Sequence, residues 1–350
     1  MNATIRSYTT YLLKIVVLGI SYYAAAQIGL RWATVGEQVT LIWFPTGIAL
    51  TALFLFGNNL WPGVALGALA VNLSTHAPLL FMFAAVGNTL QAVTAVFLLR
   101  KLHFTPQISR LADVFALLIS ALLSTAISAA IGSLLMAASG IIVWANWPVA
   151  LATWWLGDAL GVLVIAPALF TWGSDRSFPW RDWRLVEFIL LVGLSVLVCV
   201  LVFFPSFGNY GWFSFFLVNA LFPLSLWAGI RFRVRGSAAI IVLTSVLAVV
   251  GSSRGLGIFV TLSNEQGAIL LWSFINSLSL VSLILAVRTG ELRQVTAALM
   301  AEAVEREKAE TAVRASEARY RTMIEQSPLS TAVFRLDGSI VLVNPAFSQI

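Results

Sequence analysis

Long apolar runs separated by short polar loops occupy the first 287 residues of this 350-residue chain. A helix needs about 20 predominantly apolar residues to cross the hydrocarbon core of a bilayer. Ten runs approach or reach that length: 11–31, 41–56, 60–73, 79–99, 112–137, 148–171, 185–204, 212–230, 237–250 and 267–287. The pattern predicts an all-α polytopic membrane bundle of eight to ten transmembrane helices.

Three of these runs are short, which leaves the crossings open in two places. Runs 41–56 and 60–73, joined at Gly57-Asn58-Asn59, form either two thin spans or one re-entrant hairpin. Run 237–250 is either tilted or recruits flanking residues.

The pattern changes once, at Arg288, where a charged and alanine-rich stretch begins. Seven acidic residues precede Arg288, and seven more fall between Glu291 and Glu325 alone. We therefore expect an integral membrane domain at 1–287, a cytoplasmic signalling helix at 288–325 and the beginning of a small α+β domain at 326–350.

A heptad repeat can be laid along the helix after Arg288, although charged residues interrupt it at Glu302 and Arg306. Its apolar a positions are Leu292, Leu299, Val313 and Tyr320, and its apolar d positions include Val295 and Met323. We expect these residues to transmit a signal through a parallel coiled coil in a homodimer; the alternative is a solvated connector. Marginal packing would suit a switch, because a bistable element needs a small energy gap.

Composition fixes the broad class and loop charge gives the orientation. Hydrophobic residues make up 59% of the chain and charged residues 10%, far from the roughly 25% charged of soluble domains. Lys and Arg near span ends favour the cytoplasmic side. One side of the bundle collects Arg6, Lys14, Arg100, Lys101, Arg110, Arg176, Arg181, Arg184, Arg231, Arg233, Arg235 and Arg288, and the other carries Arg31 and Arg254. We expect both termini in the cytoplasm and the net charge of +6 to reflect topology and lipid contact rather than nucleic-acid binding.

Asp158 is the principal candidate site residue, because an ionisable group halfway along a span costs about 3 kcal/mol and usually faces the bundle interior. Asn88, Gln91, Asn276 or bound water could compensate it, and Arg31 lies nearer the surface. The site is either an interhelical polar link or a ligand, ion or proton site. Trp154 and Trp155, just before Gly157-Asp158, are candidates to line a cavity, together with Trp43 and Pro45 at the start of another span.

The sequence contains no recognisable motif for catalysis, phosphate binding or metal binding. His76 and His103 are isolated, no phosphate-binding glycine loop occurs, and no Cys or His cluster has metal-ligand spacing. The single cysteine, Cys199, lies in an apolar run. We expect no catalytic residue, metal or cofactor within this chain.

Several runs carry a family resemblance: Trp43-Phe44-Pro45-Thr46-Gly47, the stretches beginning at Phe56, Gly87 and Ile127, and Trp154-Trp155-Leu156-Gly157-Asp158-Ala159-Leu160-Gly161. In this order over about 15–290 they resemble the bacterial MASE-type membrane-associated sensor domain of the first kind. Asn58-Asn59 departs from the basic residues usual in that family. The resemblance implies an input module of the bacterial inner membrane, without catalytic residues or a defined ligand, and admits a membrane partner protein.

Residues 317–350 resemble the start of a PAS domain, with a helix, a strand, an Asp337-Gly338 turn, a second strand and Asn344-Pro345-Ala346-Phe347. A PAS domain needs about a hundred residues, so we expect the rest of it, and any cofactor it binds, beyond residue 350. Two strands alone do not form a stable sheet.

Two classes of function remain open. The first is a sensory input module, expected to serve a histidine kinase of a two-component system, with a diguanylate cyclase as the alternative. In it, a ligand or partner bound between Trp43 and the Trp154–Asp158 segment shifts span 267–287. The second is a transporter or channel with a regulatory tail, which the scarcity of polar groups at mid-membrane disfavours.

Overall fold

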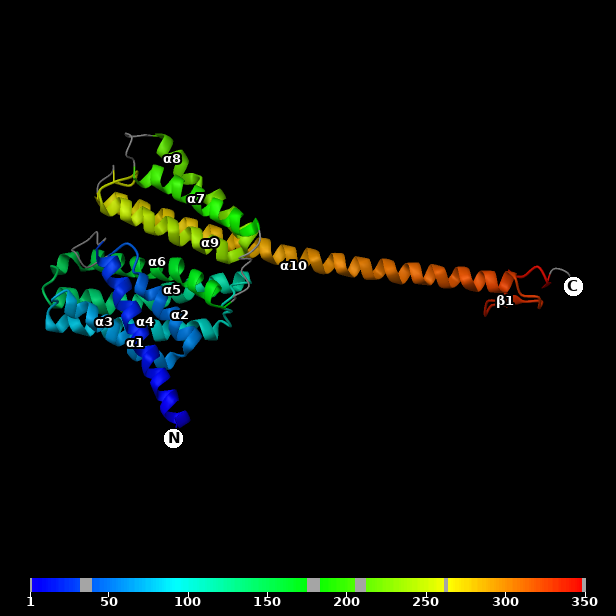
Figure 1. Cartoon of the computed structure of the whole chain (residues 1–350), viewed down its shortest axis with the longest axis horizontal. Coiled ribbons are helices and arrows are strands. Elements are labelled where there is room, and N and C mark those ends of the chain that lie inside the picture. The colour runs from blue at the N-terminus through cyan, green and yellow to red at the C-terminus, as the bar shows by residue number, and fades with distance from the viewer. Residues whose placement is uncertain (1, 32–39, 175–182, 205–211, 261–263, 348–350) are drawn as a thin grey trace. The chain divides into compact units, whose positions relative to one another are not determined.

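The computed structural model describes residues 2–31, 40–174, 183–204, 212–260 and 264–347, and helices dominate these ranges (Figure 1). Within them the α-helices are α1 (Asn2–Leu30), α2 (Phe44–Phe56), α3 (Trp61–Ser74), α4 (Ala84–Lys101), α5 (Leu111–Ala138), α6 (Trp147–Ser174), α7 (Trp183–Phe203), α8 (Trp212–Asn219), α9 (Leu221–Ser253) and α10 (Asn264–Glu325). Short 3-10 helices occupy Asn58–Leu60, Leu79–Phe83 and Trp144–Asn146. Each of the ten predicted apolar runs coincides with helical structure, which confirms the all-α class. Arg176 and Arg181, used to orient the bundle, lie outside the described residues.

Seven helical segments in the described ranges are long and apolar enough to cross a membrane, and one of them, Phe213–Ser253, contains two of the predicted runs. Two of the predicted spans miss that length because α2 has 13 residues and α3 has 14. They are separate helices, joined through Gly57, whose φ of 118° suits glycine. Whether this pair crosses the bilayer or re-enters it stays a prediction.

The apolar segment Phe213–Ser253 contains a reversal, so two of the predicted runs lie in separate arms of it. Arg233 interrupts α9 with a φ of 58°. The Ser237 hydroxyl donates to the Ser225 carbonyl at 2.9 Å, although twelve residues of straight helix would place them about 18 Å apart. The chain therefore folds back at Arg233, and runs 212–230 and 237–250 lie in different arms. The second arm extends to Ser253. Run 237–250 therefore recruits flanking residues, which is one of the two alternatives that the sequence left open for this short run.

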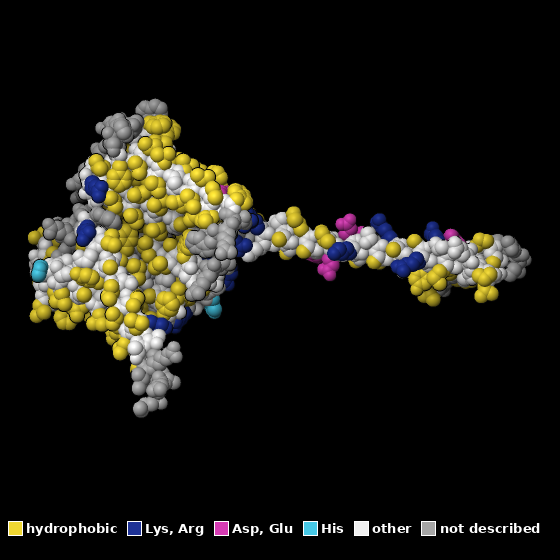
Figure 2. Space-filling model, viewed as in Figure 1, with side chains coloured by type: hydrophobic (Ala, Val, Ile, Leu, Met, Phe, Trp, Pro, Cys, Tyr) yellow, Lys and Arg dark blue, Asp and Glu magenta, His cyan; other side chains and the backbone are white. Residues whose placement is uncertain are grey.

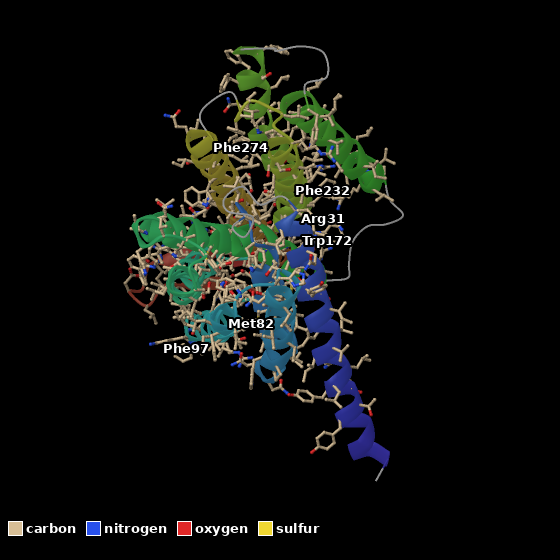
Figure 3. The ribbon with its side chains drawn as sticks, turned by 90° about the vertical axis from the view of Figure 1, so that its left-hand side faces the viewer. Arg31, Met82, Phe97, Trp172, Phe232 and Phe274 are labelled. Carbon is tan, nitrogen blue, oxygen red and sulfur yellow. The ribbon has the colours of Figure 1, made fainter. Side chains whose placement is uncertain are left out.

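The chain divides into two compact units, Met1–Glu291 and Leu292–Ile350. In the first unit, α2 packs on α6, α5 lies between α4 and α6, and α3 packs on α1 and α4. Helices α7 and α9 pair with each other, and α9 also contacts α6 (Figure 1). Phe274 of α10 packs against Phe203 and Phe222 within this second group (Figure 3). The buried α2 forms much of the centre of the first group.

The surface of the first unit is strongly apolar, with hydrophobic side chains spread over the face seen in Figure 2. On α7 alone, Ile189, Leu190 and Leu197 are more than half exposed. Soluble proteins rarely expose contiguous apolar area of this kind. The first unit is therefore integral to a membrane.

The second unit contains the end of α10 followed by a small hairpin of β1 (Ala332–Phe334) and β2 (Ile340–Val343). The strands are antiparallel, with Ala332 opposite Val343, and Gly338 has a φ of 83° in the connecting turn. Asp337 accepts hydrogen bonds from the Ser339 backbone N–H and hydroxyl, which lower the pKa of its carboxyl. The buried Asn344 receives the Thr331 and Phe347 backbone N–H groups and donates to the Ser327 and Leu329 carbonyls. The predicted order of helix, strand, Asp-Gly turn and strand is thus confirmed, while the PAS assignment stays a prediction.

Candidate functional site

Asp158 lies in the middle of α6 and is 1% exposed. Its Oδ1 accepts a hydrogen bond from Thr46 Oγ1 of α2 at 3.0 Å. Its Oδ2 accepts from Trp154 Nε1, one helical turn earlier, at 3.1 Å, and from the Ser128 hydroxyl of α5. Three side chains from three helices therefore direct neutral donors at one carboxylate, which stabilises its charged form.

The polar side chains expected to compensate Asp158 do not bond to it. Asn276 donates to the Trp272 carbonyl, and Gln91 lies outside the Asp158 pocket. Arg31, expected nearer the surface, lies just past the end of α1 (Figure 3). Asn88 is near the site but makes no hydrogen bond to Asp158. Among the described residues, Asp158 forms no ion pair with a Lys or Arg. Thr46 and Ser128 serve instead because small hydroxyl side chains fit where helices pack closely. Bound water stays a prediction.

Glycines let the start of α2 approach α6 around Asp158. The Trp43 backbone N–H donates to the Gly157 carbonyl at 3.0 Å. A Cβ on Gly157 would lie 2.5 Å from the Thr40 carbonyl oxygen, and one on Gly161 would overlap the Trp43 carbonyl oxygen. Pro45 is buried in the first turn of α2, where its missing N–H costs nothing. The Gly157 and Gly161 pair thus sets the position of Thr46 against Asp158.

The two neighbouring tryptophans have different roles. The Trp154 ring packs over Gly132 of α5, where an added Cβ would meet it at 2.5 Å, and its N–H reaches Asp158. Trp155 is 36% exposed and donates to the Leu122 carbonyl of α5 at 2.8 Å. Trp154 therefore faces the pocket beside Asp158, whereas Trp155 points away from it, because successive helical residues point about 100° apart.

A pocket opens beside Asp158 where α1 and α3 end and α2 and α4 begin. Water-sized molecules fit in about 40 Å³ of it, room for roughly two or three waters. Its walls are Leu30, Thr40, Trp43, Val71, Asn72, Thr75, Phe81, Asn88, Trp154, Gly157 and Asp158. The candidates Trp43, Trp154, Gly157, Asp158 and Asn88 thus come together here, whereas Trp155 and Pro45 do not line the pocket.

Among the described residues, hydrogen bonds that sequence reasoning missed join α10 to α6 and to α5. Trp272 Nε1 donates to the Leu156 carbonyl of α6 at 3.2 Å, two residues before Asp158. The Glu291 carboxylate accepts the Leu111 backbone N–H, the first of α5, at 3.0 Å and also pairs with Arg288. No local pattern identifies such partners, because both contacts join distant parts of the chain.

The signal-transmitting candidates on α10 present an apolar stripe to solvent. Leu292, Val295 and Leu299 are 65%, 57% and 60% exposed. Val313 and Tyr320, further along, are also more than half exposed. The single chain leaves these side chains uncovered, and the coiled coil stays a prediction.

Comparisons with known proteins agree with this architecture. The family model called MASE1 matches residues 14–293. The chain is 28% identical over 249 residues to the probable diguanylate cyclase DgcE of Escherichia coli strain K12, covering 68% of this chain and 21% of that protein. It thus spans about a fifth of the length of that relative. No solved structure matches the chain. The chain belongs to the MASE1 family and is the membrane-associated sensory module of a signalling protein.

Proposed function

We propose that the membrane unit detects a stimulus at the Asp158 pocket and transmits it through α10 to an output enzyme. The observation that carries this proposal is the hydrogen bond from Trp272 to the Leu156 carbonyl. Leu156 is separated from Asp158 by one residue, so a shift of α6 at the pocket acts directly on α10. The same helix continues without a break to Glu325.

We expect the output end to work as a homodimer. The exposed stripe at Leu292, Val295 and Leu299 has the spacing of a coiled-coil seam and gains stability when a second copy covers it. A change of register or rotation in such a seam would carry the signal to the next domain. A membrane partner protein could supply the stimulus in place of a small molecule.

The output enzyme is proposed to follow residue 350. The similarity to a probable diguanylate cyclase supports cyclic-di-GMP signalling, while a PAS-containing histidine kinase is the output that the module order alone favoured. The hairpin held by Asn344 is compatible with a PAS beginning in either case. We also propose the bacterial inner membrane with both termini cytoplasmic, which the loop arginines support.

Replacing the Trp272 donor tests the proposal. Trp272→Phe keeps an aromatic ring but removes the N–H, so we expect a several-fold change in basal or stimulated output of the complete signalling protein at equal membrane abundance. The output is measured as cyclic-di-GMP in cells and as autophosphorylation of the purified protein. The matched control is Trp227→Phe, which removes a tryptophan donor to Glu187 between α9 and α7.

Unchanged output in Trp272→Phe would contradict the proposed path. Substrate flux through the protein in proteoliposomes, independent of its tail, would instead support the transporter alternative.

A further inference from the structure

The charge of the pocket beside Asp158 favours a cationic ligand. One buried carboxylate faces the pocket, and no Lys or Arg among the described residues pairs with it. The described residues also hold no group of three or more His, Cys, Asp or Glu side chains that would bind a metal ion. A single negative charge is balanced by a monovalent cation, whereas divalent ions usually require several charged ligands.

The hydrogen-bond acceptors that line the pocket indicate which monovalent cation fits it. Asn88 is 8% exposed, lines the pocket and makes no hydrogen bond to a residue that the structure describes. Asn72 uses its NH₂ on the Phe81 carbonyl at 3.4 Å, which leaves its side-chain oxygen as an acceptor. Together with Asp158 the pocket thus offers three acceptor groups, the number that a primary ammonium with three donors requires.

The volume of the pocket and its aromatic lining residues also favour a small ammonium group. The walls include the aromatic residues Trp43, Trp154 and Phe81, and aromatic rings attract organic cations such as ammonium groups. The space of about 40 Å³ admits a group of the size of methylammonium. The pocket lies at the end of the bundle that loop charge assigns to the outside, where small amines are accessible.

We infer that this pocket binds a primary ammonium group, either of a free small amine or of a lipid headgroup, between Asp158, Asn88 and Asn72. The inference rests on the proposed function only in taking the ligand as the stimulus. The binding itself is independent of any output domain.

Calorimetric titration of the purified full chain in nanodiscs tests the inference, with methylammonium chloride as the probe and sodium chloride at equal ionic strength as the reference. We expect saturable methylammonium binding that Asp158→Asn weakens about tenfold or more and that Asn88→Leu weakens by a smaller factor. Asn276→Ala is the control, because Asn276 is a partly buried polar residue outside the pocket. Thermal unfolding of each variant shows whether it is folded. Asn88→Leu is a second pocket variant, which leaves the Asp158 carboxylate in place.

Lipid composition distinguishes the two sources. If a headgroup occupies the site, methylammonium binds more weakly in nanodiscs of phosphatidylethanolamine than in nanodiscs of phosphatidylglycerol; equal binding in both identifies a free amine. Three results overturn the inference: no saturable binding, equal binding of sodium, or binding unaffected in both folded pocket variants. A protein that binds no ammonium but still loses signalling in Trp272→Phe would retain the proposed function without this ligand.

Discussion

The surroundings of Asp158 and the exposed part of α10 differ in how far the rest of the chain covers their side chains. Around Asp158, a charged group is covered by donors from α2, α5 and α6 of the same chain. Along α10 after Leu292, apolar side chains remain open to solvent. One chain completes the packing of the first region, whereas the second would be packed only if a second copy covered it, as proposed.

The largest expected effect comes from disturbing the region that one chain completes. In Gly161→Ala, the new Cβ would overlap the Trp43 carbonyl oxygen, and a backbone atom cannot move away cheaply. We expect a loss of about 3 kcal/mol in the free energy of unfolding, at the upper end for overpacking. Thermal unfolding in detergent measures it.

Gly193→Ala is the matched control for this prediction, because a Cβ at Gly193 of α7 meets nothing within 4 Å. Removing a mid-helix glycine there should leave stability unchanged or raise it by up to about 1 kcal/mol. If both variants unfolded at the same temperature, the close contact between α2 and α6 would not be the element that holds Thr46 against Asp158.

An intermediate effect is expected in the exposed part of α10, where we propose the coiled coil. In a Cys199→Ala background, Leu299→Cys should form disulfide-linked dimers in membranes several-fold faster than Ala297→Cys, since position 297 lies on the opposite side of the heptad. Cys199 is buried, so its removal serves to exclude background cross-linking. Electrophoresis without reducing agent measures the product. Equal cross-linking at the two positions would indicate a solvated connector instead of a seam.

Sequence and structure agree on the features that repeat locally and differ on those that join distant segments. The apolar runs located the helices because each run carries its own signal, and Asp158 stood out as a charge within one of them. Thr46 and Ser128 could not be identified as its partners, since hydroxyl residues are common in close-packed helices and their pairing depends on how α2 and α5 meet α6. Asn88, expected to compensate Asp158, instead contributes a separate group to the pocket. The reversal at Arg233 lies between runs 212–230 and 237–250, which the hydrophobic pattern also predicts as separate segments.

The smallest expected effect lies at Glu291, directly before the exposed part of α10. Its carboxylate accepts the first N–H of α5, which has no partner within that helix, and also pairs with the exposed Arg288. Glu291→Ala removes both interactions and should lower the free energy of unfolding by about 1 kcal/mol, as for loss of a helix cap. Glu291→Gln keeps an oxygen acceptor and loses the ion pair, so its cost should be smaller, within about 0.5 kcal/mol. Thermal unfolding orders the two variants, and equal costs would mean that the charge pair rather than the contact with α5 fixes α10 at this point. Because this contact holds α10 just before its apolar stripe becomes exposed, Glu291→Ala should also change basal output more than Glu291→Gln does.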